Sequence, residues 1–403
     1  MPWITDHQPA ASALSSCVTC GLCLPVCPTF RMFGDETASP RGRLIAMSTV
    51  AAGDATVDER FADIMSLCLQ CRACETACPS LVPFGETMEE ARNEVEAQVP
   101  SSRSWITKFS LTRVLRSRSL LRLVTVVSTV LQRIGLLAHL PTVGKLTRGM
   151  RPLALPVRSV TGTSWGPAGG RVAMLLSGCV ADVWFSDVHQ GAIDVLVRAG
   201  FRVEIPKEQT CCGALAAHSG YAHDAEKMAH VNIAAFEGAE VIVTDVAGCG
   251  AHMESYGRYG EGGAAIASRV RDIDDLVAEL ISNGDLPTLD PTGTPVAIQD
   301  PCHLEHGQKA HTMVDTIVEA AGYTPAPIDR GGLCCGAAGL YQIAHPGVSE
   351  ELGHAKAATV RRTGSSIVVS ANAGCEMQMR RYLGSDFRVV HPIELYAESL
   401  RDS

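Results

Sequence analysis

Residues 17–28 read CVTCGLCLPVCP, and residues 68–79 repeat the same cysteine spacing as CLQCRACETACP. Each stretch has the pattern C-x2-C-x2-C-x3-C and is followed at once by proline. Two intervening residues span only about 10 Å at full extension, so the first three sulfurs of each stretch must converge. Three convergent thiolates can surround one corner of an iron–sulfur cube, and in two-cluster ferredoxins the fourth cysteine crosses to the other cluster.

The two stretches therefore predict two [4Fe–4S] clusters that exchange their fourth ligands. The predicted ligands of the first cluster are Cys17, Cys20, Cys23 and Cys78, and those of the second are Cys68, Cys71, Cys74 and Cys27. Disulfides are typical of small secreted chains, whereas this chain has 403 residues and opens MPWITDHQPA, which is unlike a signal peptide. Zinc usually takes two separated cysteine pairs. The pattern favours iron–sulfur clusters over both alternatives.

The other eight cysteines form two sets with the shared order Cys … Cys-Cys-Gly … Cys. The first set is Cys179, Cys211, Cys212 and Cys249, and the second is Cys302, Cys334, Cys335 and Cys375. Apolar runs that predict strands accompany each set, at 171–176, 201–205 and 240–245 and again at 296–299, 324–328 and 366–370. Alternation of such strands with helices indicates a parallel sheet covered by helices. Ligand sites lie at the carboxyl ends of parallel strands, so each unit is expected to gather its four sulfurs in one crevice.

Three occupants of these crevices remain open from the residues alone. They are an unusual iron–sulfur cluster, a zinc ion, and a reversible thiol/disulfide pair or no ligand at all. Adjacent cysteines need unusual backbone to face one ligand, and the glycine after each pair, Gly213 or Gly336, supplies that freedom. In cytosolic proteins such cysteine patterns are more often metal-binding or catalytic than structural.

Composition excludes some classes of function. Only 5% of the residues are aromatic and the net charge is −9, so neither base stacking nor electrostatics supports binding to nucleic acid. A length of 403 residues suggests two or three domains. So many free thiols imply a reducing compartment, and we expect a cytoplasmic protein, peripheral at the inner face of the cell membrane.

Residues 99–165 form a basic stretch with eleven Lys or Arg and no Asp or Glu. Its apolar residues approximate a helical stripe, made of Trp105, Ile106, Phe109, Val114 and Leu115. The uncharged run 123–132 is too short for a membrane span, which needs about 20 residues. Two interpretations remain: an amphipathic helix lying on an anionic bilayer, or a helical linker packed on acidic domains or on a partner subunit.

The order of these motifs resembles that of the iron–sulfur subunits of glycolate oxidases over nearly the whole chain. The run SPRGR at 39–43 and the run CPSLVPFG at 78–85 strengthen the resemblance. The same architecture recurs in the C subunit of anaerobic glycerol-3-phosphate dehydrogenase and the D subunit of heterodisulfide reductase. The SPRGR run looks more like the 2-hydroxy-acid oxidase group.

The resemblance implies an electron relay from a FAD-containing dehydrogenase subunit to a membrane acceptor such as quinone, in a complex that oxidises glycolate. Oxidation of a hydroxy acid needs an organic cofactor, and no dinucleotide-binding motif follows a predicted strand, so this chain alone is not expected to oxidise substrate. No catalytic residue is assigned. The alternatives are an iron–sulfur subunit of a glycerol-3-phosphate or D-lactate dehydrogenase, a heterodisulfide-reductase-like catalytic subunit, and a zinc-holding scaffold.

One departure from the wider family concerns the last cysteine of each unit. Heterodisulfide-reductase-like units often end in Cys-x2-Cys, but here His252 and Gln378 occupy the second position. His252 is therefore either an imidazole ligand or a solvent-facing residue. Three arginines near the first motifs, Arg41, Arg43 and Arg72, either tune the clusters or are solvated surface charges.

We therefore expect an α+β multidomain chain. Residues 1–98 are predicted to form an all-helical, ferredoxin-like domain with two [4Fe–4S] clusters. Residues 99–165 form a basic amphipathic helical connector. Residues 166–290 and 291–403 form two duplicated α/β cysteine-rich units, separated near the Gly/Pro-rich stretch 283–295.

Overall fold

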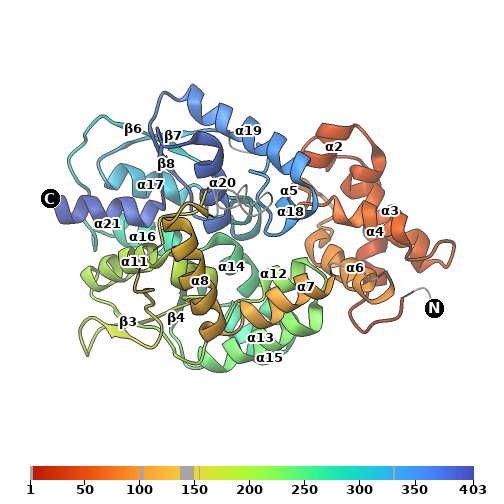
Figure 1. Cartoon of the computed structure of the whole chain (residues 1–403), viewed down its shortest axis with the longest axis horizontal. Coiled ribbons are helices and arrows are strands. Elements are labelled where there is room, and N and C mark those ends of the chain that lie inside the picture. The colour runs from red at the N-terminus through yellow and green to blue at the C-terminus, as the bar shows by residue number, and fades with distance from the viewer. Residues whose placement is uncertain (1–2, 100–103, 137–148, 154, 330–331) are drawn as a thin grey trace.

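The computed structural model describes residues 3–99, 104–136, 149–153, 155–329 and 332–403. The N-terminal helices lie at one end of the molecule, at the right in Figure 1. Two α/β units fill the other end, the first in yellow and green and the second in cyan and blue. The mixed α/β architecture predicted from the sequence is confirmed, while the exact boundaries of the domains stay a prediction.

Every regular element described before residue 100 is a helix. These are α1 (Ala11–Ser15), α2 (Pro28–Phe33), the 3-10 turn η1 (Glu36–Ala38), α3 (Pro40–Ala51), α4 (Glu59–Ser66), α5 (Ala73–Thr76) and α6 (Phe84–Gln98). The SPRGR run begins α3, where Ser39 Oγ accepts from Gly42 N–H and Pro40 occupies the first turn. A Cβ on Gly42 would lie 1.9 Å from the Glu36 carbonyl oxygen, so only glycine fits there. This close approach holds α3 against η1, beside the first cysteine motif.

The connector contains α7 (Ser104–Phe109), a π-helical turn η2 (Ser110–Val114) and α8 (Arg118–Arg133). Residues 100–103 and 137–148 of the predicted connector lie outside the described residues. Residues 155–163 are not helical, and Ser164–Trp165 form strand β1, so the connector is helical only in part. Among the described helices, none is both long and apolar enough to cross a membrane.

The two α/β units have the same strand order, as expected for a duplication. The first sheet runs β1-β3-β2-β4-β5, with β2 (Val172–Leu175), β3 (Arg202–Glu204), β4 (Val241–Thr244) and β5 (Val270–Asp272). The second runs β7-β6-β8-β9, with β6 (Pro295–Ile298), β7 (Thr324–Pro327), β8 (Ile367–Val369) and β9 (Arg388–Val390). All pairs are parallel except β1 with β3. The six predicted strands are present, and β1, β5 and β9 are additional.

Helices cover both sheets. In the first unit they are α10 (Val180–Trp184), α11 (Ser186–Arg198), α12 (Ala214–His218), α13 (Ala222–Ala235), α14 (Ala247–Met253), η4 (Tyr256–Tyr259), α15 (Glu261–Ala267) and α16 (Ile273–Ser282). In the second they are η5 (His303–Gln308), α17 (Met313–Ala320), α18 (Tyr341–Ala344), α19 (Pro346–Arg362), α20 (Ala373–Leu383) and α21 (Pro392–Asp402).

The two units share one hydrophobic core. Helix α21 of the second unit packs on α11 of the first, and α17 packs on α16. Leu196, Ile273, Ile317 and Tyr396 are all at most 1% exposed within this shared core. Burial of such large side chains stabilises each by about 1.5–3 kcal/mol, so the units hold each other in a fixed relative position.

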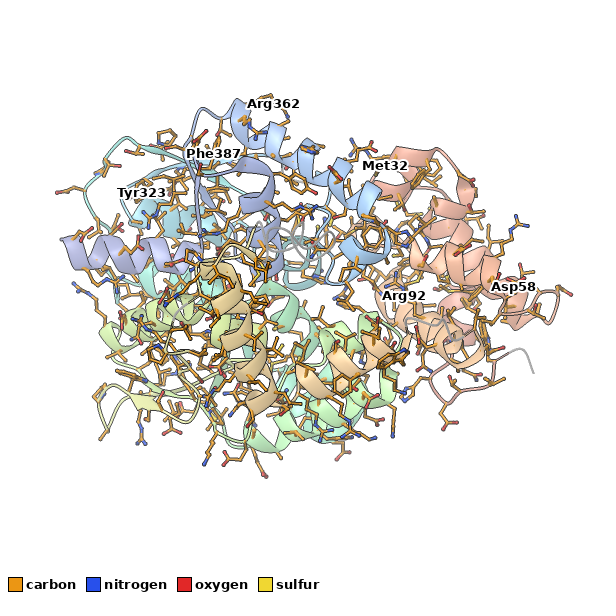
Figure 2. All side chains as sticks on the ribbon, viewed as in Figure 1. Met32, Asp58, Arg92, Tyr323, Arg362 and Phe387 are labelled. Carbon is orange, nitrogen blue, oxygen red and sulfur yellow. The ribbon has the colours of Figure 1, made fainter. Side chains whose placement is uncertain are left out.

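Hydrogen bonds attach the N-terminal domain to both units. Arg92 lies at this junction in Figure 2, where it donates to the carbonyl oxygens of Cys68 at 2.6 Å and His218 at 2.7 Å. The Tyr341 hydroxyl of the second unit donates to the Leu67 carbonyl at 3.2 Å. The cysteine motif at 68–78 therefore faces the α/β units directly.

Candidate metal centres

The structure places the cysteines of the first predicted cluster around one hollow of about 430 Å³. The cysteines that line it are Cys17, Cys20, Cys23, Cys78 and Cys74. The backbone turns sharply at Thr19 and Gly21, whose φ angles are 56° and 81°. Left-handed conformations let a short loop wrap round on itself, which brings the first three sulfurs to the same side.

The second hollow, of about 370 Å³, is lined by the other predicted set, Cys27, Cys68, Cys71 and Cys74. Its loop repeats the turn of the first, because Gln70 and Arg72 have φ angles of 56° and 64°. Burial raises the pKa of the Cys71 and Cys74 thiols well above the ordinary value. Thiolates are stable in such a place only beside positive charge, which iron supplies, so the donor set and the hollow both fit an iron–sulfur cluster.

The three arginines near these motifs are not equivalent. Arg43 is 1% exposed and donates to the Thr29 hydroxyl at 3.1 Å, which in turn lies 3.3 Å from Cys27 Sγ. The interpretation of Arg43 as a solvated charge is therefore wrong. Arg41 donates to the Thr19 carbonyl at 3.1 Å and supports the first loop, and Arg72 forms a half-buried ion pair with Glu75.

The first cysteine-rich unit brings its four sulfurs together in a row. Cys179 Sγ lies 3.2 Å from Cys211 Sγ, and Cys212 hydrogen-bonds with both Cys211 and Cys249. Cys179 follows β2, and Cys249 is in the first turn of α14 after β4, so each stands at the carboxyl end of a strand. The φ of Gly213 is 93°, which allows the Cys-Cys pair to turn into α12.

The second unit repeats the row with Cys302, Cys334, Cys335 and Cys375. Cys335 Sγ lies 3.1 Å from Cys375 Sγ, and Cys334 hydrogen-bonds with both Cys302 and Cys335. A helix follows the Cys-Cys-Gly turn directly only in the first unit, as α12, whereas the next helix described in the second unit, α18, starts at Tyr341. A Cβ on Gly336 would lie 2.8 Å from the Ser349 carbonyl, so α19 packs against the turn itself.

One thiol of each row is the preferred thiolate. Hydrogen bonds from Cys179 and Cys212 lower the pKa of Cys211 well below its ordinary value. Hydrogen bonds from Cys302 and Cys335 lower the pKa of Cys334 in the same way. Deprotonated sulfur is the form that binds metal and that reacts. Among the described residues, no three His, Cys, Asp or Glu side chains form a group arranged for a single metal ion.

The second row touches the N-terminal domain. Leu69 and Cys71 pack in one apolar cluster with Cys302, Cys334 and Tyr341. Burial is the main cause of the raised pKa of the Cys71 thiol, and the charge of the neighbouring Cys334 raises this pKa further. Met32, which also packs on this cluster, marks the junction in Figure 2. The second predicted cluster site and the second row therefore share one apolar cluster.

Three imidazoles lie between the rows, one buried (His252) and two partly buried (His218 and His303), and the sequence did not predict this arrangement. The ring of His218 stacks on that of His303 with centroids 5.5 Å apart, and its centroid lies 6.3 Å from that of His252. His218 also pairs with Glu89 of α6 at 2.7 Å. His303 follows Cys302 directly, and His252 Nε2 lies 3.4 Å from the position of a Cβ on Gly213. The group thus extends from one row to the other.

The interpretation of His252 as a solvent-facing residue is wrong. Its side chain is 4% exposed, and burial lowers its pKa to about 3. Within the described residues, Nε2 of both His252 and His303 has no hydrogen-bond partner. No sequence motif indicates this histidine group, because its members and their partners come from distant parts of the chain. Glu89 and His218, for example, are 129 residues apart.

Comparisons with known proteins agree with this arrangement. Residues 13–82 match the 4Fe-4S dicluster domain family, and residues 173–254 and 296–380 each match the cysteine-rich domain family. The chain is 34% identical to the probable glycolate oxidase iron-sulfur subunit of Bacillus subtilis, over 96% of this chain and 94% of that protein. It is 30% identical to the glycolate oxidase iron-sulfur subunit of Escherichia coli, over 97% and 95%.

The chain belongs to the glycolate oxidase iron–sulfur subunit family. The resemblance inferred from the motifs is confirmed, and the N-terminal match supports iron–sulfur clusters in this member of the family. More distant similarity reaches the lactate utilization protein A of Oceanobacillus iheyensis, at 29% identity over 54% of this chain and 93% of that protein. That similarity covers only part of this iron–sulfur subunit.

Proposed function

We propose that this chain is the electron-transfer subunit of a flavin-dependent 2-hydroxy-acid dehydrogenase, in which it carries electrons from a FAD-containing partner to a membrane quinone. The observation that carries the proposal is the closeness of two sulfur sites, because Cys71 and Cys302 both pack on the apolar cluster that contains Cys334. Neighbouring sites can exchange single electrons without a mobile carrier. Glycolate is the proposed substrate of the complex, from the names of the two relatives.

In this proposal two [4Fe–4S] clusters occupy the N-terminal hollows. Cys17, Cys20, Cys23 and Cys78 hold the first, and Cys27, Cys68, Cys71 and Cys74 hold the second. The clusters supply one-electron chemistry, and the protein sets their potentials through burial and hydrogen bonds. Two features of this chain would set the cluster potentials. The Cys71 and Cys74 thiols are buried. Arg43 donates to the Thr29 hydroxyl, which in turn supports Cys27.

The proposed position is the cytoplasmic face of the membrane, with the connector as the contact. Trp105, Ile106 and Phe109 of α7 are each more than half exposed, so this part of the predicted apolar stripe points outward, whereas Leu115 packs on the core of the first unit. Helix α8 adds Leu123 and Val127, at 60% and 49% exposed. An exposed apolar stripe among basic side chains is typical of a helix that lies on an anionic bilayer.

The relay is tested by metal content and electron paramagnetic resonance on anaerobically purified protein. We expect about eight irons per chain if only the N-terminal sites hold [4Fe–4S] clusters, and about twelve or more if a cysteine-rich unit also holds one. Glycolate added with the flavoprotein partner should then produce the signal of reduced clusters. Zinc in place of iron, or clusters that the partner and substrate leave oxidised, would refute the relay.

A further inference from the structure

His252 lies directly beside the first row of cysteines. It follows Cys249 by three residues on α14, so both side chains are on the same face of that helix. Its Nε2 lies 3.4 Å from the position of a Cβ on Gly213, the residue that directly follows Cys211 and Cys212. The imidazole therefore lies between the two segments that hold three of the four sulfurs.

The hydrogen bond at Nδ1 determines which ring nitrogen carries the hydrogen. Arg258 Nη2 lies 3.4 Å from His252 Nδ1 and is hydrogen-bonded to it. Because a guanidinium can only donate, Nδ1 must accept, and the hydrogen of the neutral ring is on Nε2. Burial lowers the pKa of His252 to about 3, which agrees with a neutral ring.

Neighbouring side chains fix the position of this ring. Glu89 of α6 accepts from Arg258 Nη1 at 2.6 Å, so a carboxylate of the N-terminal domain holds the guanidinium in place. The ring of Tyr256 stands perpendicular to that of His252 with centroids 5.7 Å apart, and its hydroxyl donates to the Cys212 carbonyl at 2.7 Å. Partners of this kind set both the tautomer and the orientation of an imidazole.

The Nε2–H group lacks an acceptor. The side chain is 4% exposed, and within the described residues Nε2 has no hydrogen-bond partner. A buried donor without an acceptor costs about 1–3 kcal/mol, so this position suits a ligand that accepts a hydrogen bond. An iron–sulfur cluster held by the row would supply an acceptor, because its sulfur atoms carry negative charge and take hydrogen bonds from the protein.

The corresponding side chain of the second unit is used differently. Gln378 follows Cys375 by three residues, as His252 follows Cys249. Its Nε2 donates to the carbonyl and hydroxyl oxygens of Ser349, at 3.2 and 3.1 Å. The unsatisfied donor at this position is therefore a feature of the first row.

We propose that His252 donates a hydrogen bond from Nε2–H to a sulfur atom of an iron–sulfur cluster held by the first row, and that Glu89 and Arg258 position it. His252 is then not a metal ligand, since a ligand would need the lone pair on Nε2. Reduction adds negative charge to the cluster and a fixed donor stabilises that charge, so His252 raises the reduction potential of this cluster. The proposal goes beyond the proposed relay, because it requires a cluster in the first row but no particular electron donor.

The test is a redox titration of the anaerobically purified full chain, followed by electron paramagnetic resonance. Cys212→Ala identifies the signal of the first-row cluster, which this variant should lose. His252→Leu removes the donor and should lower the equilibrium constant for reduction of that cluster about tenfold, a shift of about 59 mV for one electron. His252→Gln keeps an N–H donor and should restore most of the potential. Arg258→Met frees the ring and should give a smaller shift in the same direction.

His223→Leu is the control, because it removes an imidazole that is 72% exposed from the same unit, and it should leave the potential unchanged. Pulsed resonance of the wild type in H2O and D2O separates a donor from a ligand. We expect a weakly coupled exchangeable proton that His252→Leu removes. Strong coupling to an imidazole nitrogen would identify a metal ligand and overturn the proposal.

A first row without iron, or a potential that His252→Leu leaves unchanged, also overturns the proposal. Reduction of the N-terminal clusters by glycolate and the flavoprotein partner is measured on the same samples. If these clusters stay oxidised, the relay is refuted, while the result for His252 stands because the titration needs neither glycolate nor the partner.

Discussion

Arg151 ties the end of the connector to the second cysteine-rich unit, and its removal should destabilise that unit strongly. Its guanidinium is 7% exposed and forms paired hydrogen bonds with two carboxylates, Glu376 at 2.6 and 2.7 Å and Glu394 at 3.0 and 2.8 Å. It also lies over the ring of Phe185, 4.9 Å from the centroid, in the first unit. One side chain thus connects three parts of the chain.

Arg151→Met keeps the apolar stem but leaves Glu394 without its cation. Glu376, at 1% exposed, keeps only Arg380, which donates to it at 2.7 Å. Removing one partner of a buried ion pair lowers the free energy of unfolding by about 3–5 kcal/mol. Because the hydrogen bond from Arg380 to Glu376 remains, we expect a loss near the lower figure, about 3 kcal/mol. Native-state hydrogen exchange of the amides of α20 and α21 measures the free energy of opening of this region.

The exposed pair of Arg158 and Asp187 provides the control. Their atoms are 3.6 Å apart with side chains 71% and 65% exposed, so Arg158→Met should change the free energy of opening by less than about 0.5 kcal/mol. If Arg151→Met costs no more than Arg158→Met, the buried network does not hold the connector, and the reasoning is refuted.

The pH dependence of the variant gives a second check with a definite sign. Burial raises the pKa of Glu394, but the hydrogen bonds and charge of Arg151 together outweigh this and hold the pKa below its ordinary value. In the wild type, this group's contribution to stability is present at neutral pH and is lost only as the pH falls through the depressed pKa. Without Arg151, burial is opposed mainly by the backbone N–H of His391, so the pKa of Glu394 should rise. The variant should therefore gain stability as the pH falls from neutral through this raised pKa, whereas the wild type should not.

Three further predictions concern other parts of the chain. Cys78→Ser should change the resonance signal of the first cluster and Cys27→Ser that of the second, each with loss of iron; the reverse pattern would disprove the crossed ligand assignment. Arg92→Gln removes charged hydrogen bonds to buried carbonyls and should cost about 2–3 kcal/mol, read as faster amide exchange in residues 65–71. Burial raises the pKa of Asp272 to about 7, so the folded state holds an extra proton and stability should fall as the pH rises from about 4 to 7. Because burial also raises the pKa of Asp274, Asp272→Asn should reduce that slope in denaturant titrations at several pH values, and a slope equal to that of the wild type would contradict this origin.

The sequence predicted the parts of the structure that depend on local spacing. The cysteine motifs indicated which sulfurs gather, and the apolar runs located six strands. Strands β5 and β9 were missed because they read VRD and RVV, short stretches in which arginine interrupts any apolar run. The direction of the connector's apolar stripe was also open, since an amphipathic pattern does not say whether protein or solvent meets the apolar face.

Contacts between distant segments could not be read from the sequence. Arg43 of α3 is buried where it donates to Thr29 of α2 and to the Ile64 carbonyl of α4, so three separate helices create its environment. His252 and His303 resemble any other histidine beside a cysteine motif until folding places His218 between them. Their positions follow from the shared core of the two units, which no motif records.

The duplicated rows differ in their neighbours rather than in their sulfurs. The second row meets Cys71 of the N-terminal domain, and the charge of Lys356, 5% exposed, contributes to the lowered pKa of Cys334. The first row meets the connector instead, since Leu115 and Leu121 line the same small hollow as Cys179 and Cys211. The duplication thus kept both sulfur sets but placed one against the N-terminal domain and the other against the connector. In the proposed relay, the second row is therefore the one nearest the N-terminal clusters.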